Sequence, residues 1–143
     1  MEVLSALWVY VLPFLIILTV VVFVHELGHY AVARWSGVRV EVFSIGCGPE
    51  IAGWNDTRGT RWKISWVPLG GYVKFFGDSN AASAAGAETA EMSAPERAVS
   101  FHHKRLDQRT AIVSAGPIAN LVFAVVVYAI LFSTFGQPYA PPV

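Results

Sequence analysis

Hydrophobic residues along this 143-residue chain gather into two long stretches, one near each end. The first has no charged side chain from residue 3 to residue 24, and the second is uncharged from residue 110 onward, with its most apolar part at 111–132. At about 1.5 Å rise per residue, some twenty helical residues cross a hydrocarbon layer roughly 30 Å thick. The pattern therefore predicts two transmembrane helices, one within residues 1–36 and one within 110–135.

Pro13 leaves the start of the first helix open, because proline is tolerated in the first turn of a helix but kinks its interior. A helix that begins near Pro13 and ends near Trp35 places His25 about 18 Å along it, inside the span. A helix that begins near Val3 places His25 at the edge of the membrane instead. Gly37 is a natural stop in both cases.

Between the two stretches the pattern alternates with a period of two, which is typical of half-buried strands. The residues that share one face of these strands are Val38, Val40 and Val42 in the first and Thr60, Trp62, Ile64 and Trp66 in the second. WNDTRG (54–59) predicts a turn between strands, and GCGP (46–49) and PLGG (68–71) punctuate the pattern. We expect residues 37–78 to form a small membrane-associated antiparallel sheet, with an ordinary soluble hairpin domain as the alternative.

The remaining segments carry weaker signals. Residues 79–95 are rich in Ala, Ser and Gly without an apolar face, and a basic stretch follows, so 79–109 is predicted to be a flexible linker and a juxtamembrane segment. Residues 136–143 are expected to be an extracytoplasmic tail. The predicted fold class is an α-helical membrane protein with two transmembrane helices and a small antiparallel β-sheet.

Composition and charge placement agree with a membrane protein. The chain is 55% hydrophobic and 14% charged, and its net charge of zero gives no support to a nucleic-acid partner. A single cysteine, Cys47, excludes an internal disulfide. All ten Lys and Arg residues lie between residues 34 and 109, which predicts a cytoplasmic loop at 37–109 and both termini on the outer side.

The candidate chemistry lies at HELGH, residues 25–29, which fits the HExxH pattern. His25 and His29 share one helical face and can bind one metal ion, while Glu26 is placed to act on the water of that ion. Zinc suits imidazole ligands and hydrolysis, so we predict a zinc site with Glu26 as the general base. The alternative is a polar cluster at the membrane interface that matches the motif by chance.

Three linked segments make the motif more specific. They are HELGHYAVARWSGVRVEVFSIGCGP, PLGGYVKFFGD and FHHKRLDQRTAIVSAGPIAN, and they are spread over residues 25–120 of the chain. In these segments the sequence resembles the amino-terminal part of the site-2 proteases, which are zinc intramembrane metalloproteases. The resemblance is closest to the bacterial branch that includes the regulator of sigma E protease.

This resemblance implies roles for particular residues. His25 and His29 would be zinc ligands, Glu26 the catalytic acid and base, and residues 38–76 the β region that receives substrate. Gly116, Pro117 and Asn120 would belong to a motif of the second helix beside the site. The candidate substrate-binding residues, in the strands VRVEVF and PLGGYVKFF and in the second helix, are Val38, Val40, Val42, Gly70, Gly71, Tyr72, Val73 and Asn120.

The sequence departs from the family pattern in two ways. GCGP replaces the usual GFGP, so Cys47 stands where an aromatic residue is expected, and we do not expect its thiol to bind zinc. The family supplies its third ligand as an aspartate in a later transmembrane helix, after extracytoplasmic PDZ domains, and neither is present here. We therefore expect an incomplete enzyme whose missing carboxy-terminal half carries these parts.

Other polar residues are weaker candidates. Asp78, Glu96 and Asp107 are expected to be solvated charges, and His102 and His103 exposed interfacial side chains. Asn120 lies in an apolar span and must find a partner, so it either bonds to a neighbouring helix or positions substrate near the metal.

The expected function is zinc-dependent cleavage of transmembrane segments in the bacterial inner membrane. Single-span proteins such as anti-sigma factors, or remnant signal peptides, are the substrates that the resemblance implies. The alternative is a catalytically incomplete membrane module that binds zinc or helices without proteolysis.

Overall fold

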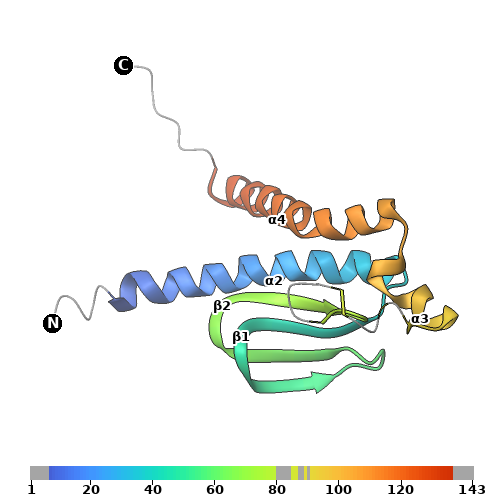
Figure 1. Ribbon diagram of the computed structural model, residues 1–143. Coiled ribbons are helices and arrows are strands. Elements are labelled where there is room, and N and C mark those ends of the chain that lie inside the picture. Colours follow the sequence, from blue (N-terminus) through green and yellow to red (C-terminus); the bar gives the residue numbers. More distant parts are fainter. Residues whose placement is uncertain (1–6, 80–84, 87–88, 90, 137–143) are drawn as a thin grey trace, which may run out of the picture.

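The computed structural model describes residues 7–79, 85–86, 89 and 91–136. Its elements, in chain order, are a π-helical turn η1 (Leu7–Val11), α2 (Leu12–Trp35), β1 (Val40–Asn55), β2 (Arg61–Phe75), α3 (Ala94–Val99), a 3-10 turn η3 (Phe101–His103) and α4 (Leu106–Phe135). The two long helices run side by side, and the sheet lies against one side of α2 (Figure 1). Residues 137–143 of the predicted tail (136–143) and residues 80–84, 87–88 and 90 of the predicted linker lie outside the described residues.

The helical segment around Pro13 is continuous. α2 begins at Leu12 with Pro13 in its first turn, and η1 extends the helical segment back to Leu7, so the register of this segment in the membrane stays a prediction. His25 is therefore about 20 Å from the start of α2, well inside it. Gly37, with φ +71°, follows the last turn as predicted.

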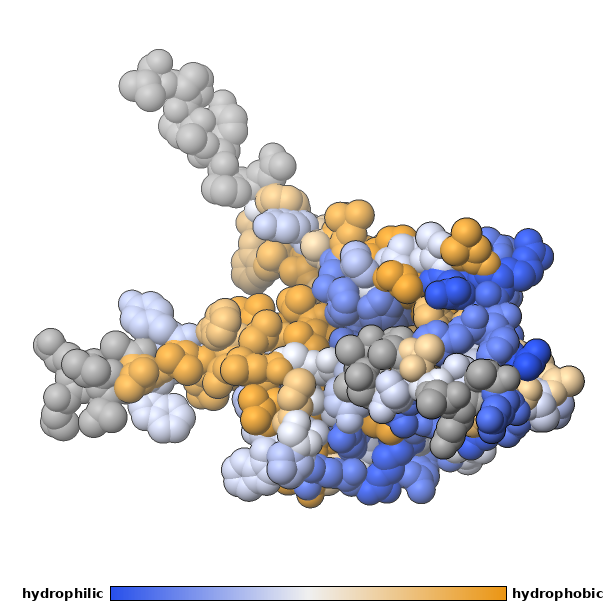
Figure 2. Space-filling model, viewed as in Figure 1, coloured by the Kyte–Doolittle hydropathy of each residue, from blue (hydrophilic) through white to orange (hydrophobic). Residues whose placement is uncertain are grey.

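Both long helices are apolar enough to cross a membrane by length and composition, over Leu7–Trp35 and Leu106–Phe135. Large apolar side chains such as Phe14, Leu121 and Tyr128 are exposed on their surfaces. Figure 2 shows this hydrophobic surface over the helices, whereas hydrophilic residues gather over the sheet and the neighbouring end of α4. The two predicted apolar helices and the predicted sheet are confirmed.

The sheet consists of β1 and β2, two long antiparallel strands that both bend. Phe43, in the first half of β1, pairs with Val73 in the second half of β2 and with Trp62 in the first half. The first half of β1 therefore lies between the two halves of β2 (Figure 1). The second half of β2 forms the edge next to α2.

GCGP and PLGG mark bends inside the strands. Gly46 shows why the bend needs glycine: its φ is +83°, and a Cβ there would lie 2.7 Å from the carbonyl oxygen of Val67. A larger residue would both strain the backbone and push the strands apart. These glycines therefore mark bends within β1 and β2 and not the ends of strands.

One small core joins the sheet to both helices. It consists of Ala33, Val38, Val40, Phe43, Val73, Phe75, Phe101 and Ile112. Phe43 packs edge-on against Phe23 and Tyr30 of α2, with ring centroids 5.9 and 5.7 Å apart. The sheet is thus fixed to α2 through aromatic contacts close to the HELGH segment.

A buried ion pair joins the segment before α4 to the sheet. Asp78 and His102 were predicted to be solvated or exposed, and both predictions are wrong: the carboxylate of Asp78 is fully buried and lies 2.8 Å from Nε2 of His102. The second carboxylate oxygen of Asp78 accepts the N–H of Phe75 at 2.9 Å. This pair ties the end of β2 to the turn that leads into α4, which begins at Leu106 and not near 110.

Asp56 organises the turn between the strands. Its carboxylate accepts the backbone N–H groups of Arg58 and Thr60 at 2.8 and 2.9 Å, and also lies 3.2 Å from Nε1 of Trp62 and 3.3 Å from the hydroxyl of Tyr30. Burial alone would raise the pKa of Asp56, but these hydrogen bonds hold it below its usual value. The turn is thereby linked to α2 through Tyr30.

Replacing Asp56 with Ala should lower the free energy of unfolding by about 1–2 kcal/mol, because the turn N–H groups lose their acceptor. The lowered pKa makes this contribution fully present above the ordinary carboxyl pKa, about 3.9, and lost as the pH falls through the folded-state value. Thermal unfolding in detergent should therefore show a difference between Asp56→Ala and wild type at pH 7 that shrinks below about pH 4. An equal difference at both pH values would contradict the role of the charge.

Candidate metal centre

The HELGH segment lies on α2 and turns both histidines toward α4. Nε2 of His25 and Nε2 of His29 are 3.2 Å apart, and the two rings meet nearly edge-on with centroids 4.8 Å apart. Residues four apart on a helix lie on one face, which brings these rings together. Two imidazole nitrogens therefore converge on one point, as the sequence predicts.

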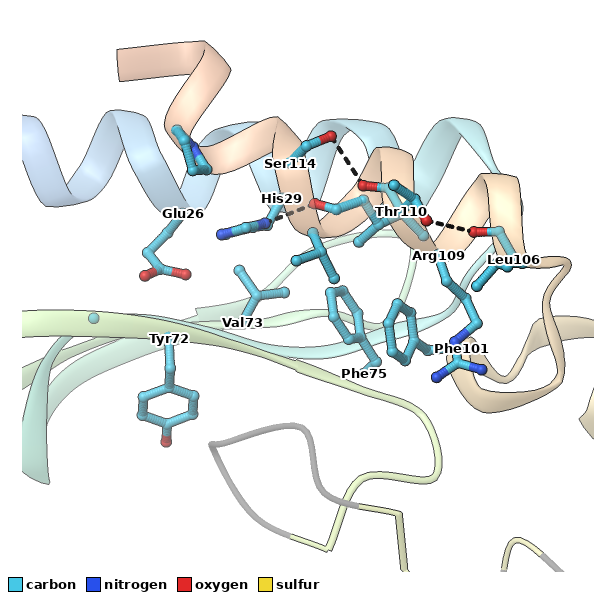
Figure 3. Close-up of a pocket in the computed structure, with 14 residues that line it drawn as sticks. Glu26, His29, Tyr72, Val73, Phe75, Phe101, Leu106, Arg109, Thr110 and Ser114 are labelled. Atoms are coloured by element: carbon cyan, nitrogen blue, oxygen red, sulfur yellow. Dashed lines mark hydrogen bonds between the residues drawn. The ribbon is translucent and has the colours of Figure 1, made fainter. Parts of the chain in front are cut away.

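The other nitrogen of His29 is fixed by the backbone of α4. Nδ1 of His29 lies 2.8 Å from the carbonyl oxygen of Ile112, which can only accept a hydrogen bond (Figure 3). Nδ1 must then carry the proton, so Nε2 keeps its lone pair. Donation of the second ring N–H to a carbonyl is how proteins usually orient a histidine that binds metal.

Asn120 of α4 contacts the Nδ1 nitrogen of His25, as Ile112 contacts that of His29. Its side-chain Nδ2 lies 3.2 Å from Nδ1 of His25, while its Oδ1 is buried and has no hydrogen-bond partner among the described residues. The two amide ends are interchangeable by a 180° rotation about the last side-chain bond. With the amide turned, Oδ1 accepts the Nδ1–H of His25, which satisfies the buried oxygen and leaves the lone pair on Nε2.

Glycines allow the two helices to come this close. A Cβ at Gly28 of α2 would lie 2.7 Å from Cβ of Ala119, and a Cβ at Gly116 of α4 would overlap Nε2 of His29 and lie 2.7 Å from Nε2 of His25. Small residues at such a crossing are typical of helix packing in membranes. Gly116 leaves open the space in front of the two nitrogens.

These residues fit a zinc ion. Two ligands of a tetrahedral zinc, each about 2.0–2.1 Å from the metal, lie about 3.3 Å apart, close to the distance between the two Nε2 atoms. His25 and His29 would hold the ion. Within the described part of the chain no group of three potential ligands occurs, so these residues supply two.

The other acids do not complete the site. Asp78 bonds to His102, Asp107 to Arg105 and Glu96 to Ser93. Cys47 is exposed, at the bend of β1, and belongs to no group of metal ligands among the described residues.

The edge of the sheet approaches Glu26. A Cβ at Gly71 of β2 would lie 3.2 Å from Cγ of Glu26 and 3.0 Å from a methyl carbon of Val22. Glu26 and His29 line one end of a pocket of about 810 Å³ between β2 and α4. Figure 3 shows the Glu26 carboxylate directed toward β2, with Tyr72 pointing to the opposite side of the strand.

The predicted substrate-binding residues fall into two groups. Val38 and Val40 are 1% and 0% exposed and belong to the core, and the half-buried Val42 lies in the part of β1 with β2 on both sides. VRVEVF is therefore not a free edge, and the hypothesis that it forms one is wrong. Gly70, Gly71, Tyr72 and Val73 lie on the edge beside Glu26 and remain candidates, while Asn120 contacts His25.

Comparison with known proteins identifies the family. The model of Peptidase family M50, the site-2 proteases, matches residues 13–141. The chain belongs to this family. Its expected membership is thereby confirmed, while the closer resemblance to the regulator of sigma E protease stays a prediction.

Named relatives match most of this chain. The chain is 54% identical over 136 residues to a "Putative zinc metalloprotease" of Rhizobium meliloti and 52% identical over 135 residues to one of Agrobacterium fabrum, covering 94% of this chain in each case. It is 45% identical over 131 residues to Metalloprotease MmpA of Caulobacter vibrioides, covering 85% of this chain. The chain spans about a third of the length of these M50 relatives: 36%, 36% and 33%.

Some features of this M50 site had no sequence signal. Any residue supplies a backbone carbonyl, so the contact between Ile112 and His29 could not be predicted. Arg109, which lines the far end of the pocket, was grouped with the other basic residues near the membrane. The partner of Asn120 was one of two alternatives, and the structure favours the bond to a neighbouring helix.

Replacing Asn120 with Leu should weaken zinc binding about 10–100-fold, because His25 loses the group that fixes its tautomer. Competitive chelator titration of the full-length protein measures this change. Asn120→Asp keeps an acceptor for Nδ1–H and should bind zinc at least as well as wild type. Unchanged affinity in Asn120→Leu, with an unaltered melting temperature, would show that Asn120 does not act through His25.

Proposed function

We propose that this chain is the zinc-binding part of an intramembrane endopeptidase. The observation that carries the proposal is the pair of Nε2 atoms 3.2 Å apart, each ring fixed at Nδ1 by α4, within a helix apolar enough to span a membrane. Ionisable side chains in such a helix are costly unless they are paired or coordinated. Membership in Peptidase family M50 and relatives named as zinc metalloproteases support zinc as the metal.

The proposal includes insertion in the bacterial inner membrane. In this proposal α2 and α4 cross the membrane, residues 37–109 lie in the cytoplasm and both termini face outward. The apolar length of both helices and the basic residues between them support this arrangement. The exposed apolar side chains of both helices support contact with lipid. A third zinc ligand comes from outside the described residues, together with the PDZ domains that the resemblance implies.

Glu26 carries the proton transfers. Zinc, when bound, supplies a Lewis acid that lowers the pKa of water and polarises a peptide carbonyl. Glu26 takes the proton from the attacking water and returns it to the amide nitrogen that leaves. Its carboxylate is free for this work, since it has no hydrogen-bond partner among the described residues and lines the pocket.

The edge of β2 is suited to hold an unwound substrate. A helix in lipid hides its carbonyl groups in its own hydrogen bonds, so cleavage requires an extended segment. The N–H of Phe76 donates to the carbonyl oxygen of Arg39 at 2.9 Å and so points toward the β1 side. Backbone groups of successive residues in a strand point to alternate sides, so the N–H and C=O of Val73 point away from β1. A substrate strand added there would lie in the pocket beside Glu26.

The proposed substrates are single-span membrane proteins, such as anti-sigma factors or remnant signal peptides. A second function, a membrane module that binds zinc or helices without proteolysis, is favoured by the finding that the described residues supply only two ligands. The two proposals differ in whether Glu26 has any chemical role.

Replacing Glu26 with Gln should lower proteolysis of a single-span substrate at least 100-fold while leaving one zinc per protein, because the amide cannot accept the proton. Cleavage by the full-length protein in liposomes and elemental analysis measure the two quantities. Glu91→Gln makes the same change at an exposed site and should cleave normally. Absence of proteolysis in wild type would instead support the non-catalytic module.

Replacing Val73 with Pro should reduce cleavage with zinc retained, because it removes an outward N–H from the edge strand and leaves the bonds to β1 intact. Val40→Pro, inside the sheet, should lose both zinc and activity as the core collapses. The same assays distinguish the two effects. Normal cleavage by Val73→Pro would exclude substrate binding at this edge.

A further inference from the structure

The pocket beside the metal centre has one charged residue at each end. Of the described residues that line it, only Glu26 and Arg109 carry a formal charge at neutral pH, and the wall between them is mostly apolar, with Val73, Phe75 and Phe101 prominent. Figure 3 shows Glu26 and Arg109 at opposite ends, with these side chains between them. A segment that fills the pocket therefore meets a cation at the end away from Glu26.

Arg109 is held in place but not neutralised. Its guanidinium lies over the ring of Phe101, 5.4 Å from the centroid, and Phe101 stacks on Phe75 at 5.1 Å. Nε of Arg109 is buried without a hydrogen-bond partner, and the structure gives the guanidinium no carboxylate or carbonyl acceptor among the described residues. A buried, unpaired donor is unfavourable, and an acidic ligand on the outer nitrogens would offset this cost in part.

Two independent distances relate Arg109 to the cleavage position. Along α4, Arg109 is seven residues before Gly116, which abuts the histidines, and this corresponds to about 10 Å. Along β2, Phe75 is four residues beyond Gly71, which abuts Glu26, and this corresponds to about 13 Å. An extended peptide covers either distance in three to five residues.

We propose that Arg109 is a specificity-determining residue that binds an acidic side chain of the substrate. That acid lies three to five residues from the cleaved bond, on the side toward the start of α4. This inference rests on the proposed proteolytic function of the same site. A carboxylate can take two parallel hydrogen bonds from a guanidinium, so aspartate and glutamate fit where an amide pairs less well.

A substrate segment suits the pocket better than a lipid headgroup does. The pocket is continuous from Arg109 to Glu26 and His29, and its floor is the edge strand with outward N–H and C=O groups at Val73. Such groups pair with a polypeptide backbone and not with an acyl chain. A lipid phosphate at Arg109 is the competing outcome in the experiment.

The test uses the full-length protein in liposomes and a single-span substrate with Asp or Asn placed at each of eight positions on the α4-start side of the cleaved bond. Wild type should cleave the Asp form at least tenfold better, by kcat/KM, when the acid is three to five residues from that bond. Arg109→Gln should reduce this ratio to about one, and Arg109→Lys should retain part of it. Arg105→Gln is the matched control, because Arg105 is largely exposed, pairs with Asp107 and does not line the pocket.

Several results would overturn the proposal. The first is an Asp preference that survives in Arg109→Gln, and the second is an Asp preference that Arg105→Gln removes equally. The third is cleavage that depends on Arg109 and on phosphatidylglycerol in the liposome but not on the acid of the substrate. Zinc content and melting temperature of each variant report whether it folds.

Binding of the same substrates to Glu26→Gln, measured by cross-linking, separates this inference from the proposed function. The Asp preference should appear in Glu26→Gln and vanish when Arg109→Gln is added. Preferential binding without any cleavage in wild type would overturn the proteolytic function and leave the role of Arg109 standing. Equal binding of Asp and Asn forms would overturn the role of Arg109.

Discussion

The close crossing of α2 and α4 is the constraint on which the rest of the structure depends. Gly28 and Gly116 have no side chain to separate the helices, so the histidine face of α2 lies directly against α4. That contact brings the carbonyl of Ile112 and the amide of Asn120 to the two Nδ1 atoms. The candidate metal site is therefore a property of the helix pair, although both proposed ligands come from one helix.

The site and the core are built from shared residues. Val73, Phe75 and Ile112 belong to the core, and the same residues line the pocket beside Glu26. Phe101, in the turn before α4, also lines the pocket. The next residue, His102, is fixed by its contact with the carboxylate of Asp78. Packing the sheet against the helices thus shapes the pocket beside Glu26 in the same step.

Local patterns predicted much of this structure. Spacing by four residues placed His25 and His29 together, Gly37 ended the helix, and alternation predicted the strands, because each depends on a few neighbouring residues. The position of β1 between the halves of β2 depends on bends at Gly46 and Gly70, which local alternation does not report. The burial of Asp78 likewise depends on His102, twenty-four residues away, so local sequence patterns could not predict it.

The two histidines differ in what holds them, and this has an evolutionary consequence. The acceptor for His29 is part of the main chain, so no substitution at Ile112 other than one that distorts the helix can delete it. The partner of His25 is a side chain that a single codon change removes. A single substitution can thus remove the partner of His25 much more readily than the partner of His29. Among descendants of this protein that lose the site, we expect substitutions at Asn120 to come first.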